Sequence, residues 1–182
     1  MDKSERIATG DYLSMLETMR RRELVYGVVR EPPAPLYGHQ SIITKLTVRL
    51  DQHVRRKALG RVCVSPIDVV LDEEKALILQ PDIIFVSNER LGIIRDQIWG
   101  APDLVIEVAS RGTIKYDRTT KLEWYRQYGV RECWIVNPTA RRIDVIEFGS
   151  TAPQPRAFEG RSLVRSVVLP GLRLRVDDVF NC

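Results

Sequence analysis

Residues 100–110, GAPDLVIEVAS, place one acidic residue in the middle of an otherwise apolar run. The apolar residues around Glu107 are typical of a buried β-strand. A carboxylate buried without a partner costs several kcal/mol. The sequence therefore predicts that Glu107 has a polar partner, and the identity of that partner decides what the strand is for.

Two other acids enter neighbouring strands directly after a proline, in the pairs Pro81-Asp82 and Pro102-Asp103. A Pro-Asp pair is common in a turn at a strand entrance, which accounts for Asp103 better than for Asp82. Asp103 and Glu107 are about 13 Å apart along one strand, too far to share a metal ion, whereas neighbouring strands lie about 4.8 Å apart. Asp82 is therefore the expected partner of Glu107, with a divalent cation between the two carboxylates.

A helix is expected over residues 116–128, ended by Gly129. Four of its residues fall on one stripe of the helix surface: Asp117, Lys121, Tyr125 and Tyr128. If this helix packs against the sheet, the ammonium of Lys121 reaches the two carboxylates. Two acids and a lysine suit the placing of a metal ion, the activation of water and the neutralising of a phosphodiester. The alternative is that Asp117 and Lys121 form an exposed helical pair worth a few tenths of a kcal/mol.

The rest of the chain predicts further strands and helices in one mixed sheet. Helices are expected over 9–19 and 39–59, the second ended by Gly60. Strands are expected over 23–31, 61–72, 76–87, 101–110, 132–138 and 142–149, and the tail predicts edge strands followed by a short helix. The predicted fold class is α/β or α+β, with helices on either side of the sheet and a single domain over residues 1–182.

Composition excludes several classes of protein. The hydrophobic fraction of 44% supports a sizeable core, but no apolar run approaches the roughly 20 residues needed to span a bilayer. The N-terminal residues show no secretion signal, and the three cysteines show no disulfide or zinc spacing. A cytoplasmic location is expected.

The net charge of +4 is compatible with a polyanionic partner. Basic runs at residues 20–22 and 55–57 would supply contacts to a phosphate backbone. The alternative is that both runs are simply solvated surface.

The order of Pro81-Asp82, Glu107 and a helical Lys121 resembles the PD-(D/E)XK nuclease superfamily. More narrowly, the chain resembles the Uma-type family of restriction-endonuclease-like proteins. The resemblance covers most of the chain, and residues 100–138 carry its most specific block. In the basic superfamily pattern the lysine lies two residues after the acid, a position that is Ala109 here, so Lys121 would be a migrated lysine.

This resemblance implies a restriction-endonuclease-like core in which Asp82 and Glu107 bind Mg²⁺ or Mn²⁺ and Lys121 completes the catalytic set. The auxiliary positions that match are Glu23, His39, Ser110, Asp117 and Tyr125. The residues Arg111-Gly112 and Asn137 differ from the family's usual ones, and both lie outside the expected ligand set.

The function expected from the residues and the resemblance is metal-dependent hydrolysis of phosphodiesters in DNA or RNA, with a homodimer as a plausible assembly. One alternative is a non-catalytic nucleic-acid-binding or protein-interaction module on a nuclease fold. Another is a metal-dependent hydrolase of small phosphoesters.

Overall fold

A computed structural model of the chain describes residues 6–16, 18–110, 117–149 and 154–181. The helical segments are α1 (Thr9–Leu13), α2 (Tyr37–Lys57), the 3₁₀ helix η1 (Asn88–Ile93), the π-helical turn η2 (Asp117–Lys121), α4 (Leu122–Tyr128) and α5 (Val176–Phe180). The first strands are β1 (Glu23–Val25), β2 (Val28–Arg30), β3 (Gly60–Val64), β4 (Val69–Asp72), β5 (Leu77–Leu79) and β6 (Ile83–Ser87). The later strands are β7 (Ile98–Trp99), β8 (Leu104–Val108), β9 (Glu132–Asn137), β10 (Arg142–Glu147) and β11 (Arg156–Glu159).

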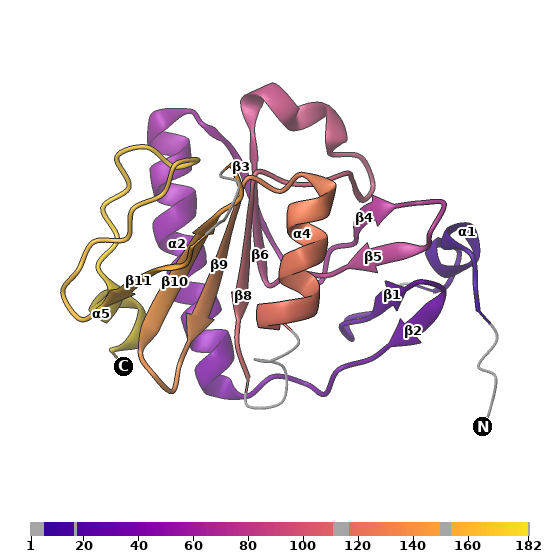
Figure 1. Ribbon diagram of the computed structural model, residues 1–182, viewed down its shortest axis with the longest axis horizontal. Helices are drawn as coiled ribbons and strands as arrows, with labels where there is room; N and C mark the ends of the chain where they lie inside the picture. Colours follow the sequence, from indigo (N-terminus) through magenta and orange to yellow (C-terminus); the bar gives the residue numbers. More distant parts are fainter. Residues whose placement is uncertain (1–5, 17, 111–116, 150–153, 182) are drawn as a thin grey trace.

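The strands form two mixed sheets that adjoin one another (Figure 1). The larger sheet has the order β11-β10-β9-β8-β6-β3, and the smaller has the order β2-β1-β5-β4-β7. β8 and β9 are parallel, whereas β6 and β8 are antiparallel. The predicted mixed α/β class is confirmed, but the strands are divided between two sheets.

Prolines account for that division. The predicted strand over 61–72 is interrupted near Pro66, so β3 joins the larger sheet and β4 the smaller. In the same way, Pro81 separates β5 from β6 within the predicted strand 76–87. Proline has no N–H to donate to a ladder and interrupts a central strand.

Helices α2 and α4 lie on opposite faces of the larger sheet (Figure 1). Alternate residues of β8 point to opposite faces: Leu104, Ile106 and Val108 pack in the same cluster as α2, and Val105 and Ala109 in the same cluster as α4. The same alternation directs Glu107 toward the face of α4, where Lys121 and Tyr125 lie.

The end of α2 differs from the prediction that Gly60 ends it. Ala58 closes the helix in the left-handed conformation, with a φ of 50°. Gly60 instead begins β3, where an added Cβ would lie 2.0 Å from the carbonyl oxygen of Val86 on β6. The glycine is needed for the close approach of these two strands rather than for the helix end.

Helix α1 is shorter than the predicted 9–19. It ends at Leu13, and the side chains of Leu16 and Met19 are 92% and 88% exposed. These residues have no core to pack against, so their helical spacing does not extend the helix. The described residues of the segment 14–22 instead form an irregular connection to β1.

Among the described residues, no helix is both long enough and apolar enough to cross a bilayer.

Candidate active site

Asp82 lies immediately before β6, with each carboxylate oxygen held by a different group. Its Oδ2 accepts a hydrogen bond of 2.7 Å from the Val108 backbone N–H and lies 3.4 Å from His39 Nε2. Its Oδ1 accepts a hydrogen bond of 2.8 Å from the guanidinium of Arg21. β8 therefore anchors one oxygen of Asp82 and leaves the other to face Arg21.

The two carboxylate oxygens of Glu107 on β8 likewise bind different groups. Its Oε1 accepts hydrogen bonds from Tyr125 Oη at 2.6 Å and Lys121 Nζ at 3.1 Å. Its Oε2 accepts a hydrogen bond of 3.1 Å from Arg21. The π-helical turn η2 and helix α4 thus anchor one oxygen, and Arg21 binds the other.

Lys121 pairs with two carboxylates, and the second is Glu23. Lys121 Nζ lies 2.6 Å from Glu23 Oε1, at the start of β1 in the smaller sheet. Lys121 is only 3% exposed, so the alternative reading of an exposed helical pair is wrong. Glu23, Asp82, Glu107 and Lys121 are all gathered at the junction of the two sheets.

Arg21 bridges the two predicted metal ligands, a contact that the sequence did not indicate. Its guanidinium binds Asp82 and Glu107 and lies 3.7 Å from Glu23 Oε1. The sequence predicts that the basic run at 20–22 contacts a phosphate backbone, whereas Arg21 is turned inward toward Asp82 and Glu107. Three nearby carboxylates attract its charge more strongly than solvent does.

The site is covered rather than open. Glu107 and Asp82 are only 1% and 2% exposed. The side chain of Arg21 is 22% exposed, so it lies between the carboxylates and solvent. The surrounding cations compensate the burial of the acids.

The pKa of Asp82 is lowered in the folded protein. Burial alone would raise it, but His39, the charge of Arg21 and the Val108 N–H together outweigh burial. The pKa of Tyr125 is raised well above its usual value, by burial first and then by Glu107 and Glu23. The phenol therefore stays protonated and donates its hydrogen bond to Glu107.

The lowered pKa of Asp82 predicts a specific acid sensitivity. A carboxyl with a lower pKa in the folded state stabilises the fold above its unfolded pKa of about 3.9, and this contribution is lost as pH falls below that value. We expect the free energy of unfolding of Asp82→Asn to lie well below that of the wild type at pH 7, with the gap narrowing toward pH 3. Urea unfolding across this range measures the gap, and exposed Asp11→Asn serves as the control. A difference in the free energy of unfolding that does not change with pH would contradict the lowered pKa of Asp82.

The remaining predicted residues have different positions. His39, near the start of α2, contacts Asp82, and Tyr125 contacts Glu107. Ser110 follows β8 and is exposed. The side chain of Asp117 lies outside the described part of the chain. Asp103 lies directly before β8, as predicted for a strand-entrance residue, and its carboxylate accepts a hydrogen bond of 2.7 Å from the Ser87 N–H.

A layer of hydrogen bonds that the sequence did not reveal holds the segment of Arg21 and Glu23. Gln80 Oε1 accepts a hydrogen bond from the Arg22 N–H, and Gln80 Nε2 donates one to Asp68. The Gln80 backbone N–H donates to Glu23 Oε1. The only signal for this role was the place of Gln80 beside Pro81-Asp82.

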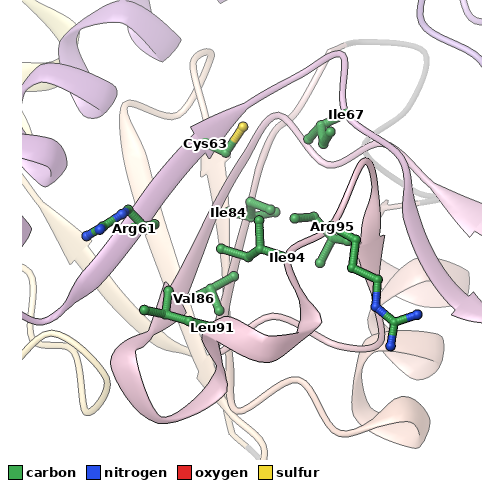
Figure 2. Close-up of a pocket in the computed structure, with 9 residues that line it drawn as sticks. Arg61, Cys63, Ile67, Ile84, Val86, Leu91, Ile94 and Arg95 are labelled. Atoms are coloured by element: carbon green, nitrogen blue, oxygen red, sulfur yellow. The ribbon is translucent and has the colours of Figure 1, made fainter.

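A cavity of about 410 Å³ lies on the larger sheet away from these acids. Figure 2 shows its mostly apolar lining, with the exposed thiol of Cys63 at one side. It has no carboxylate among its lining residues. The cavity therefore lacks the acidic side chains that the sequence predicts as metal ligands.

The donors of the cluster fit a hard divalent cation. Mg²⁺ and Mn²⁺ prefer carboxylate oxygens, and Asp82 Oδ1 and Glu107 Oε2 already face a common cation, the guanidinium of Arg21. Within the described ranges, no group of three or more His, Cys, Asp or Glu side chains is arranged to hold a metal. Such an ion would therefore need water or substrate oxygens as well, as Mg²⁺ commonly does.

Comparison with known proteins identifies the family. The model of the Uma2 family, described as "Putative restriction endonuclease", matches residues 9–177. The chain belongs to this family. No curated protein matches the chain.

A solved structure shares the fold. A crystal structure described as a "putative nuclease belonging to DUF820", from Anabaena variabilis, has a TM-score of 0.79 and 19% sequence identity. The match covers 96% of this chain and 97% of that chain. The restriction-endonuclease-like fold expected from the sequence is confirmed by this likeness.

Proposed function

We propose that this protein is a Mg²⁺- or Mn²⁺-dependent nuclease that hydrolyses phosphodiester bonds in DNA. The observation that carries the proposal is the convergence of Asp82 Oδ1 and Glu107 Oε2, from neighbouring antiparallel strands, on one cationic group. The family description and the nuclease named in the structural comparison support the same class of reaction.

Asp82 and Glu107 would hold the metal ion, which when bound supplies a water of lowered pKa and an electrophilic contact to the phosphate. Lys121 and Tyr125 fix Glu107 through its other oxygen, and His39 and the Val108 N–H fix Asp82 in the same way. These contacts preorganise the two ligand oxygens. Lys121 also sets a positive charge close to where the phosphate would bind, which favours the developing negative charge of the transition state.

Basic residues near the site would bind the nucleic-acid backbone. Arg20 is exposed beside the site. The run 55–57 lies at the far end of α2 from His39, about 25 Å away at 1.5 Å per residue. We therefore assign Arg20 to contacts near the cleaved bond and residues 55–57 to flanking nucleic acid. A homodimer would supply two such sites for cutting both strands of a duplex.

The alternative of a non-catalytic nucleic-acid-binding module is favoured by one observation. Arg21 already neutralises the two acids, so a permanently bound Arg21 would leave no place for a metal ion. The protein would then bind nucleic acid without cleaving it.

Cleavage of supercoiled plasmid, single-stranded DNA and RNA tests the proposal. We expect the purified chain to cut DNA with Mn²⁺ or Mg²⁺ and to lose this activity when the ion is removed with a chelator. Activity should return when the ion is restored. If the folded protein binds nucleic acid yet cuts none of the three substrates with either ion, the binding-module alternative replaces the nuclease proposal.

A further inference from the structure

We propose that Arg21 is a built-in cation that occupies the metal position and must leave before a divalent ion binds. This inference rests on the proposed function and concerns its regulation. Arg21 would then keep the two ligand oxygens closed to a metal ion until its side chain withdraws from them.

The contacts of Arg21 carry the first step. It binds Asp82 Oδ1 at 2.8 Å and Glu107 Oε2 at 3.1 Å. These are the oxygens that remain after Val108, Tyr125 and Lys121 bind the other oxygen of each carboxylate. Within the described part of the chain, Arg21 is the side chain that binds both Asp82 Oδ1 and Glu107 Oε2. A divalent ion would need the same two oxygens, so the two cations compete.

Charge carries the second step. The carboxylates of Glu23, Asp82 and Glu107 face the cations Arg21 and Lys121, which leaves one formal negative charge. A divalent ion added beside Arg21 would make the cluster net positive in a buried place, where like charges repel strongly. Replacement of Arg21 by that ion leaves the cluster neutral. Exchange is therefore electrostatically favoured over simple addition.

The packing of the segment carries the third step. Leu16 and Met19 are almost fully exposed, and the described residues between α1 and β1 have no regular structure. Apolar packing of this segment therefore does little to hold the side chain of Arg21, whereas the backbone of Arg22, the residue after it, is anchored by Gln80 and Tyr12. The Nε atom of Arg21 is buried without a hydrogen-bond partner among the described residues, so its present position is also imperfectly satisfied.

Competition predicts that removing Arg21 raises metal affinity. If the state with Arg21 withdrawn is populated at about 1–10%, metal binding is weakened by that fraction. We expect Arg21→Ala to bind Mn²⁺ roughly 10- to 100-fold more tightly than the wild type, by titration calorimetry or by the electron paramagnetic resonance of free Mn²⁺. Arg49→Ala is the control, because the Arg49 side chain is 54% exposed and pairs with Asp178 away from the cluster, and it should bind Mn²⁺ as the wild type does.

Folding of the variant is controlled separately. Without metal, Arg21→Ala should unfold at a lower temperature than the wild type, and Mn²⁺ should raise its melting temperature by more. If the alanine variant fails to fold, Arg21→Lys retains a charge but loses the two-nitrogen fork, and it should show intermediate Mn²⁺ affinity.

A second readout uses the unmodified chain. Saturating Mn²⁺ should speed trypsin cleavage at residues 20–22, because Arg21 is released, while cleavage at 55–57 stays unchanged as an internal control. Slower or unaltered cleavage at 20–22 would contradict the proposal that a divalent ion displaces Arg21.

The outcomes separate the two ideas. Mn²⁺ binding by the wild type with equal or weaker affinity in Arg21→Ala overturns the displacement of Arg21 and leaves the nuclease proposal standing. Absence of Mn²⁺ binding in both folded proteins overturns both.

Discussion

Glu107→Gln is expected to reduce metal-dependent DNA cleavage at least about 10³-fold, because several kcal/mol of transition-state stabilisation are lost and each 1.36 kcal/mol is tenfold in rate. Glutamine has nearly the same shape and still offers an oxygen to Lys121 and Tyr125. It lacks the negative charge that a divalent ion requires. The substitution therefore removes the chemistry while retaining the packing of β8.

Initial rates of plasmid nicking with Mn²⁺ measure this effect, with circular dichroism to confirm the fold. Glu123→Gln is the matched control, since Glu123 lies in the adjacent helix α4 with an exposed side chain paired to Arg126. It should cut at the wild-type rate. Salt-sensitive DNA binding should survive in both variants. If Glu107→Gln retained cleavage, the two-carboxylate site would be the wrong site.

Lys121→Met is expected to lower the free energy of unfolding by about 3–5 kcal/mol, the usual cost of removing one partner from a buried ion pair. The side chains of Glu23 and Glu107 are 5% and 2% exposed, so their charges would remain buried without Lys121. Methionine keeps most of the length of the side chain. The loss therefore reports the charge rather than a cavity, and it is large compared with a typical total stability of 5–15 kcal/mol.

Urea unfolding followed by far-ultraviolet circular dichroism measures this loss. Lys75→Met is the control, because Lys75 pairs with Asp72 through a side chain that is 60% exposed, and solvent screens such a pair. It should change stability little. Adding Glu23→Gln to Lys121→Met should recover part of the loss, because one buried unpaired charge is then removed. Equal effects of Lys121→Met and Lys75→Met would contradict the buried pair.

The elements that carry the site residues were predictable because the spacing of apolar and polar residues along the chain indicates strands and helices. The apolar run around Glu107 indicated a buried strand, and the carboxylate within that run indicated a polar partner. The strand spacing excluded Asp103 and pointed to Asp82, which lies immediately before the neighbouring strand β6. The helical stripe brought Lys121 and Tyr125 onto the face that meets Glu107. The catalytic roles of these residues stay predictions.

Only the tertiary structure shows which side chain lies between the carboxylates and solvent. Arg21 lies 61 residues from Asp82 and 86 from Glu107, and nothing in a run of three arginines distinguishes the one that turns inward. The division into two sheets and the end of α1 depend likewise on which surfaces find a partner. Local periodicity reports which face of an element is apolar, whereas long-range electrostatics and packing decide what covers that face. For this protein the sequence by itself indicated that Asp82, Glu107 and Lys121 come together, and only the folded chain placed Arg21 against the two carboxylates.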